Sequence, residues 1–225
     1  MTRLVALLCA VMAVGIGGYF VLGSSGTNTT EISPFVSAAH AQDSSEIDIS
    51  TVEEMTLGAE DAPVTMIEYA SFTCPHCASF HQNIFKDIKK NYIDTGKVKL
   101  VYREVYFDKY GLWASLIARC GGPEKFFGIA DLMYKSQAEW VRAGGAPEIA
   151  GELRKIARLA GVDKETLDQC LSDGQQAQKM VAWYQHNAEA DDITGTPSFI
   201  LNGQKIANQG SYEAFAKLID AELEK

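Results

Sequence analysis

Two cysteines separated by two residues, in Cys74-Pro75-His76-Cys77, constrain this chain more than any other feature. They follow an apolar, β-branched segment over residues 64–69 and precede a helix-like stretch over residues 78–90. At the first turn of a helix, unpaired backbone N–H groups and the helix dipole stabilise an anion, so a thiolate at Cys74 is favoured. Cys77, one helical turn later, can close onto Cys74 as a disulfide. The pattern therefore predicts thiol–disulfide exchange.

A C-x-x-C pair is also half of many zinc sites. His76 and His81, together with the two cysteines, would complete a set of four candidate ligands. His76 lies between the cysteines, however, too close to chelate alongside both sulfurs without strain, and no second C-x-x-C or H-x-x-x-H follows. We expect no metal, no organic cofactor, and a helix-surface position for His81.

A second signal lies far downstream, where Thr196-Pro197 precedes a short apolar run and an Asn202-Gly203 turn. Proline cannot donate to a sheet ladder, so it belongs at a strand start or edge, and X-Pro is the common site of a cis peptide. Asn-Gly between short apolar runs predicts a hairpin. A C-x-x-C after the first long strand, with a Thr-Pro before a late hairpin, resembles the thioredoxin fold. In that fold a cis-proline loop lies against the active-site disulfide.

Three features sharpen the resemblance to the DsbA family of periplasmic thiol–disulfide interchange proteins. They are the dipeptide Pro75-His76, a long helical insertion before Thr196-Pro197, and the lead-in segment Glu68-Tyr69-Ala70-Ser71-Phe72-Thr73. The similarity covers about residues 55–224. It implies an α/β, thioredoxin-like fold with an inserted all-helical domain.

The resemblance also implies roles for individual residues. Cys74 is the expected nucleophile, Cys77 the resolving cysteine, and Thr196-Pro197 the cis-proline pair that binds substrate. Glu68, six residues before Cys74, matches the family's buried acid, and a carboxylate there could accept the proton of Cys77 as it attacks.

The direction of electron flow stays open. An imidazole at His76 near the sulfur, together with the helix N-terminus, would lower the pKa of Cys74 and make the disulfide a strong oxidant. Thr196, however, stands where the best-known oxidases have valine, and threonine also occurs there in isomerase and reductase relatives.

The hydrophobic pattern predicts a βαβ unit, in which strands over 64–70 and 97–106 form a parallel pair joined by a helix over 77–92. A hairpin over 199–207 and a final helix over 211–223 follow the insertion. The predicted organisation is a first thioredoxin part over 55–107, a helical insertion over 108–190 and a second thioredoxin part over 191–225. Within the insertion, helices are expected from 112, around 126–133, and over 147–160, 164–171 and 174–189.

The remaining pair of downstream cysteines, Cys120 and Cys170, falls within the insertion. In an oxidising compartment two leftover cysteines often pair, and closing a loop of about 50 residues would stabilise the fold by roughly 4 kcal/mol in the chain-entropy model. The alternative is two separate buried thiols. We favour a structural disulfide.

The N-terminal region indicates an extracytoplasmic protein. An uninterrupted apolar run over residues 4–22 follows Arg3, and Ala39-His40-Ala41 fits a signal-peptidase site. Residues 1–41 are therefore a cleaved signal peptide, or a membrane anchor with a linker, and residues 42–54 a flexible lead-in. Either interpretation places the active domain in the periplasm. The net charge of −9 and the lack of a basic run argue against nucleic-acid binding.

Three functions remain open. The first is a dithiol oxidase that introduces disulfides into reduced or unfolded secreted proteins, and the resemblance implies a quinone-linked membrane partner that reoxidises it. The second is a disulfide isomerase or reductase of the same fold. Such isomerases usually carry an N-terminal dimerisation domain, which the short stretch before Glu53 does not offer, so we expect a monomeric oxidase. The third is a zinc-binding or chaperone-like module without redox turnover.

Overall fold

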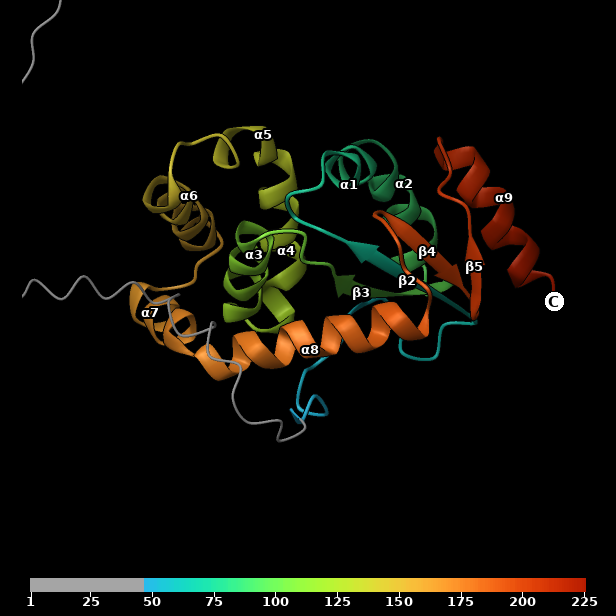
Figure 1. Ribbon diagram of the computed structural model, residues 1–225. Helices are drawn as coiled ribbons and strands as arrows, with labels where there is room; N and C mark the ends of the chain where they lie inside the picture. The colour runs from blue at the N-terminus through green and yellow to red at the C-terminus, as the bar shows by residue number, and fades with distance from the viewer. Residues whose placement is uncertain (1–46) are drawn as a thin grey trace, which may run out of the picture. The chain divides into compact units, whose positions relative to one another are not determined.

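A central five-stranded sheet organises the computed structural model, which describes residues 47–225 (Figure 1). Its strand order is β1-β3-β2-β4-β5. The middle pair, β2 and β3, is parallel, and every other pair is antiparallel. The parallel pair confirms the predicted βαβ unit. The strands are β1 (Met55–Leu57), β2 (Val64–Ala70), β3 (Val98–Glu104), β4 (Ser198–Leu201) and β5 (Gln204–Ile206).

The connection between β2 and β3 is a helix whose winding changes along its length. It begins as α1 (Pro75–Phe80), passes through a π-helical turn, η2 (His81–Phe85), continues as α2 (Lys86–Ile88) and ends in a second π-helical turn, η3 (Lys89–Ile93). The sequence predicted one regular helix over 77–92. A π-helical turn bonds each N–H one residue further back than an α-helix does, so the side chains that follow rotate relative to the α-helical pattern.

Six helices lie between β3 and β4 in the described chain, and α9 (Tyr212–Leu223) closes it. Aspartate side chains cap three of them, because Asp108, Asp163 and Asp173 accept backbone N–H groups at the starts of α3, α7 and α8. The six are α3 (Lys109–Cys120), α4 (Pro123–Lys135), α5 (Gln137–Trp140), α6 (Ala146–Leu159), α7 (Lys164–Ser172) and α8 (Gly174–Ala190).

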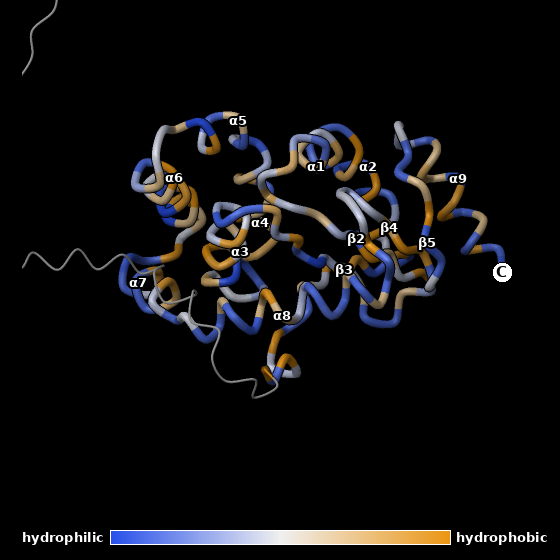
Figure 2. The backbone as a smooth tube through the Cα atoms, viewed as in Figure 1, coloured by the Kyte–Doolittle hydropathy of each residue, from blue (hydrophilic) through white to orange (hydrophobic). Residues whose placement is uncertain are grey.

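Strand alternation gives the sheet two apolar faces, and helices cover both. One face packs against the connecting helix and α9, through residues such as Met66, Leu100, Phe80 and Phe215. On the other face, Tyr69, Val105 and Ile200 pack with Tyr184 of α8. Figure 1 shows α8 running along the side of the sheet opposite α1 and α2, and Figure 2 shows apolar residues recurring along β2 and β4 between these layers.

The inserted helices share a core with the end of the sheet. Phe72, which follows β2, and Tyr102 of β3 lie among aromatic side chains of α4. The ring centroids of Phe72 and Tyr134 are 5.2 Å apart, and those of Tyr102 and Phe126 are 5.5 Å apart. Because the core is continuous, the domain boundaries at 107/108 and 190/191 stay predictions.

The N-terminal predictions fall mostly outside the described residues, which exclude the apolar run over 4–22 and the Ala39-His40-Ala41 motif. Within residues 47–225, no helix combines the length and apolar character that a membrane crossing requires. Part of the segment expected to be a flexible lead-in packs on the core, since Val52 is buried and the Glu53 carbonyl accepts a hydrogen bond from Arg119.

Candidate active site

Strand β2 delivers the C-x-x-C segment to the start of α1. After Ala70 the chain turns, and the backbone N–H of Cys74 donates to the Ser71 carbonyl at 3.1 Å. Cys74 is the N-cap of α1, and Pro75 occupies the first helical position, where no backbone donor is needed. Cys77 lies in the first turn and is fully buried, whereas Cys74 keeps 9% of its surface exposed. Both are free thiols in this structure.

The two thiols have opposite surroundings. The Cys77 thiol donates a hydrogen bond to the Cys74 sulfur, and this bond lowers the pKa of Cys74 to about 5, with further help from the backbone N–H groups of Cys77 and His76. Burial, reinforced by the hydrogen bond to the Cys74 sulfur and the nearby charge of Glu68, holds the pKa of Cys77 well above its usual range. One exposed thiolate is thus paired with one buried thiol.

The Thr196–Pro197 peptide bond is cis and lies beside Cys74. The Cys74 sulfur is 3.5 Å from the Thr196 carbonyl oxygen, 122 residues away in sequence. Pairing of β2 with β4, which sets Tyr69 opposite Ser198, brings this loop to the end of the strand that leads into the C-x-x-C. The Thr196 hydroxyl oxygen is buried and has no hydrogen-bond partner among the residues of the described chain.

The two residues between the cysteines point outward. Pro75 and His76 are both exposed. His76 stabilises the Cys74 thiolate through its backbone N–H, which lowers the pKa of Cys74. The role predicted for its imidazole stays a prediction.

Glu68 is fully buried in the middle of β2, and its partner is His81. The His81 Nε2 atom lies 2.9 Å from Oε1 and 3.1 Å from Oε2 of the carboxylate. His81 is itself only 5% exposed, so its prediction as a helix-surface residue is wrong. His81 lies four residues after buried Cys77, so it shares the face of the helix that is turned toward the sheet.

The inserted helices hold the loop before Cys74. The Gln137 side chain of α5 is buried, and its Nε2 donates to the carbonyl oxygens of Phe72 at 2.7 Å and Cys74 at 2.9 Å. From the other side, the Asp108 carboxylate accepts a hydrogen bond from the Thr73 hydroxyl at 2.8 Å. Gln137 was not predicted, because its short helix carries no periodic pattern that would place it.

The four residues considered as zinc ligands are not arranged around a common point. His81 faces the Glu68 carboxylate, and His76 is exposed. Among the described residues, no group of three or more His, Cys, Asp or Glu side chains is placed to hold a metal ion.

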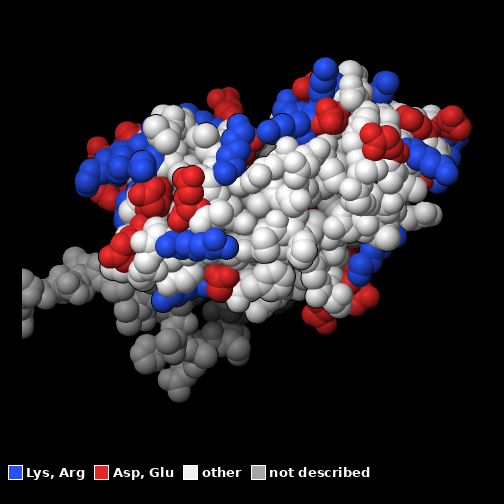
Figure 3. Space-filling view, turned by 90° about the horizontal axis from the view of Figure 1, so that it is seen from above, with Lys and Arg blue, Asp and Glu red and all other residues white. Residues whose placement is uncertain are grey.

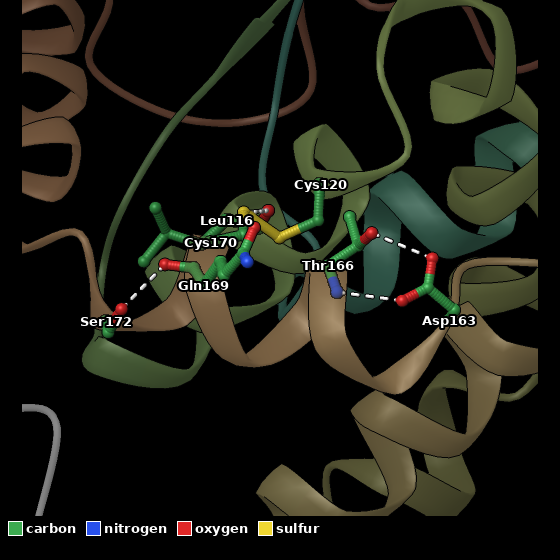
Figure 4. The surroundings of a disulfide bond; sticks show 7 residues. All are labelled: Leu116, Cys120, Asp163, Thr166, Gln169, Cys170 and Ser172. Atoms are coloured by element: carbon green, nitrogen blue, oxygen red, sulfur yellow. Dashed lines mark hydrogen bonds between the residues drawn. A yellow bond between two sulfur atoms is a disulfide. The ribbon is translucent and has the colours of Figure 1, made fainter.

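Cys120 and Cys170 form a disulfide that joins the end of α3 to α7 (Figure 4). Their Cα atoms are 5.8 Å apart, within the usual range for a disulfide, and 50 positions separate them in sequence. The Cys170 sulfur also lies 3.6 Å from the Leu116 carbonyl oxygen. The start of α7 is fixed separately by Asp163, which accepts the backbone N–H and the hydroxyl of Thr166.

A sheet with a C-x-x-C at the head of its crossover helix, facing a cis-proline loop, defines a thioredoxin-like dithiol protein. The family model described as "Thioredoxin" matches residues 50–221. Two solved structures share the fold. The alpha-DsbA1 of Wolbachia pipientis is 29% identical with a TM-score of 0.70, and the match covers 77% of this chain and 92% of that one. Oxidised BdbD from Bacillus subtilis is 27% identical with a TM-score of 0.63, covering 76% of this chain and 94% of that one.

Proteins related by sequence belong to the same group as these structural matches. Disulfide bond formation protein D of Bacillus subtilis is 30% identical over 179 residues, which cover 74% of this chain and 76% of the relative. A Rickettsia bellii protein with a provisional name as a protein-disulfide oxidoreductase is 36% identical over 173 residues, 76% of this chain. Only 65% of that relative is spanned, and 61% of its counterpart in Rickettsia felis. The chain belongs to the thioredoxin family and, within it, to the DsbA-like disulfide-bond formation proteins.

Proposed function

We propose that this protein is a thiol–disulfide oxidoreductase that works as a dithiol oxidase. The observation that carries the proposal is the stabilised thiolate at Cys74, whose pKa falls to about 5 beside the buried thiol of Cys77. A group stabilised only in the reduced protein favours the dithiol over the disulfide. The Cys74–Cys77 disulfide is therefore a strong oxidant of other thiols.

The reaction has two exchange steps. A substrate thiolate attacks the Cys74 sulfur of the oxidised protein, a mixed disulfide forms, and the Cys77 sulfur leaves with the electron pair. A second substrate thiol then loses its proton and attacks the substrate sulfur of the mixed disulfide. The substrate leaves with a new disulfide, and the protein retains two thiols. Cys74, the more exposed of the pair, is the sulfur that a substrate can reach first.

Reduced, unfolded secreted proteins are the proposed substrates. Backbone groups of Thr196 beside Cys74 can pair with an extended chain in the manner of an added strand. Seen from above, the side on which α1 and α5 lie, the molecule has a broad central area without charged side chains (Figure 3). Such an uncharged surface places no charge requirement on the polypeptide that it contacts.

The proposed location, oligomeric state and redox partner are taken from the resemblance to the DsbA family. We place the protein in the periplasm as a monomer, delivered by a signal peptide or held by an N-terminal anchor, with a quinone-linked membrane protein as its reoxidant. The division into a thioredoxin domain and a helical insertion belongs to the same proposal. The competing function is isomerase or reductase, and Thr196, at the position where oxidases carry valine, favours it.

The deciding experiment measures the reduction potential of the Cys74–Cys77 pair against glutathione and the rate at which the protein oxidises a reduced, unfolded substrate. A potential well above about −270 mV, the thioredoxin value, together with substrate oxidation that Cys74→Ser abolishes, supports the oxidase. A potential near the thioredoxin value supports a reductase or isomerase. Retention of oxidation by Cys74→Ser would remove the proposal altogether.

A further inference from the structure

The buried pair of His81 and Glu68 lies beneath the dithiol. The His81 Nε2 atom contacts both carboxylate oxygens, at 2.9 and 3.1 Å, and the side-chain exposures are 6% and 0%. A buried carboxylate is costly unless a partner donates to it. The imidazole is that partner.

The ring of His81 is fixed by its neighbours. It stacks on Tyr134 of α4 with centroids 4.3 Å apart at 16°, and it contacts the ring of Phe85 at 4.7 Å. Strand alternation puts Glu68 on the same face of β2 as Met66, toward the helix that carries the cysteines. Both members of the pair are therefore held in place from separate elements.

The proposed exchange reaction creates a need for a proton at this location. When a substrate thiolate attacks Cys74, the electron pair passes to the sulfur of fully buried Cys77. Among the described residues, the titratable groups that interact with Cys77 are Cys74, whose sulfur is in the mixed disulfide at this step, and Glu68, Tyr102 and Tyr134. His81 contacts Glu68 and stacks on Tyr134.

The two tyrosines are poor proton donors. Their hydroxyls bond each other at 2.6 Å, and burial keeps the pKa of each well above the ordinary tyrosine range. The His81–Glu68 pair is the remaining source of a proton.

We propose that His81 is a positioning residue for the exchange reaction, which holds on the Glu68 carboxylate the proton that Cys77 takes up as its sulfur leaves. The inference rests on the proposed oxidoreductase function. Before the step, the pair shares one proton and is neutral, and the leaving sulfur is negative. Afterwards Cys77 is a neutral thiol, and the pair carries the negative charge on Glu68, hydrogen-bonded to the neutral imidazole. The net buried charge is the same before and after the proton transfer, so the low-dielectric interior does not oppose it.

The reverse step uses the same pair. When Cys77 attacks a mixed disulfide at Cys74, its proton returns to the pair, and the sulfur forms the internal disulfide while the other thiolate leaves. His81 thus acts through Glu68 in both directions and does not touch the reacting sulfurs.

The test is a set of variants in the full-length protein: His81→Gln, Glu68→Gln, the double variant, and His186→Gln as a matched control at an exposed histidine of α8. Glutamine can still donate to the carboxylate but cannot carry an extra proton. The readout is the single-turnover rate at which dithiothreitol reduces the Cys74–Cys77 disulfide, measured from acid to alkaline pH.

We expect His81→Gln to slow exchange by about tenfold at neutral pH and to change the pH profile, since general acid–base catalysis contributes about 10² or more. His186→Gln should behave as the wild type. The double variant should be no slower than Glu68→Gln, because His81 acts through that carboxylate. A wild-type pH profile in His81→Gln, or losses that multiply in the double variant, would overturn the proposal.

A second measurement decides the matter even where a variant folds poorly. The imidazole NMR signals of the wild-type protein are followed against pH in the disulfide and dithiol forms. The His81 signal should differ between the two forms, because the proposed proton exchange with Cys77 couples the imidazole to the redox state of the sulfurs, and the His186 signal should be the same in both. Identical His81 signals in the two forms at every pH contradict the proposal.

These readouts separate the two claims. Reduction by dithiothreitol involves only the Cys74–Cys77 disulfide and no protein substrate. If His81→Gln leaves the rate and pH profile of that reduction unchanged, this inference is refuted and the proposed oxidase function is not affected. Failure of the wild type to oxidise protein substrates refutes the proposed oxidase function and leaves the result for His81 intact.

Discussion

Cys74 and Cys77 are identical side chains three positions apart, and their surroundings make them chemically different. Cys74 occupies the N-cap position of α1, where the Cys77 thiol and nearby backbone N–H groups favour its thiolate. Cys77 is buried above Glu68, and a second negative charge there is unfavourable. The asymmetry supports the proposal that a substrate thiolate attacks the Cys74 sulfur and that Cys77 is the resolving cysteine.

The reduction potential should follow pH with an unusual slope. With the pKa of Cys74 at about 5, reduction takes up one proton above pH 5 and two below it. The potential should therefore fall by about 30 mV per pH unit above pH 5 and about twice as steeply below. Titration against glutathione at several pH values checks this, and a uniform steep slope through neutral pH would contradict it.

The same shift makes the stability of the reduced protein depend on pH. The folded pKa of Cys74 lies below the unfolded value of 9.0, so its thiolate stabilises the folded dithiol form fully above about pH 9. That contribution declines as the pH falls and is lost below about pH 5. The disulfide form has no titrating thiol at this position and provides the comparison in urea unfolding.

Gln137 tests whether the inserted helices support the redox site. Gln137→Leu leaves the buried carbonyls of Phe72 and Cys74 without a donor, and we expect a loss of about 1–3 kcal/mol in the free energy of unfolding. Gln185→Leu, at an exposed glutamine of α8, is the control and should be nearly neutral. Urea unfolding of both variants measures the difference, and equal losses would argue against the role of the amide.

At the scale of elements, periodicity predicted the regular parts of the fold. The parallel strands, the hairpin and the long helices α6, α8 and α9 all follow repeating apolar patterns. Strand β1 and helix α5 were missed because three or four residues are too few to establish a period. The π-helical turn was missed for another reason, since its winding depends on contacts between elements. The buried position of His81 follows from ordinary spacing, because it lies four residues after buried Cys77 and so shares its face of the helix.

The disulfide between α3 and α7 should stabilise the insertion. Closing a loop with a separation of 50 residues restricts the unfolded chain, which contributes about 4 kcal/mol in the chain-entropy model. We expect the Cys120→Ala/Cys170→Ala double variant to lose about 2–4 kcal/mol in the free energy of unfolding, with the Cys74–Cys77 pair kept in one redox state throughout. An unchanged midpoint in guanidinium chloride would show that the bond contributes little.

At the scale of the molecule, a buried ion pair connects three segments far apart in sequence. Arg119 of α3 donates from Nε and Nη2 to the two oxygens of Glu104 at the end of β3, at 2.6 and 2.7 Å. Its Nη1 donates to the Glu53 carbonyl at 2.7 Å. The carboxylate is fully buried, and one guanidinium joins the sheet, the insertion and the N-terminal segment.

Breaking that pair from one side should be strongly destabilising. Arg119→Met leaves a buried carboxylate unpaired, and we expect a loss of about 3–5 kcal/mol in the free energy of unfolding. Arg119→Met/Glu104→Met should recover much of it, because no charge remains buried. Lys164→Met, which removes an exposed pair with Asp168, is the control and should cost less than about 1 kcal/mol. A double variant as unstable as Arg119→Met would refute this account.

The site residues that belong to a short sequence motif could be predicted, and those that reach the site only through packing could not. Cys74, Cys77 and the Thr196-Pro197 pair carry their chemistry in a short pattern. Glu68 could be noticed because an acid interrupts an apolar strand. Its partner could not be identified, since His81 is joined to it only when the connecting helix folds over β2. The amide of Gln137 reaches the active-site loop from 63 positions away, which no local pattern shows.

The two edges of the sheet differ from its centre in length. Strands β1 and β5 at the margins have three residues each, whereas β2 and β3 inside have seven. Long open edges bind other extended chains and seed aggregation. If the protein acts on unfolded polypeptides as proposed, a chain paired at the proline loop is released by exchange, whereas a chain paired at a sheet margin would have no such release. The short margins leave few backbone groups open to that second kind of pairing.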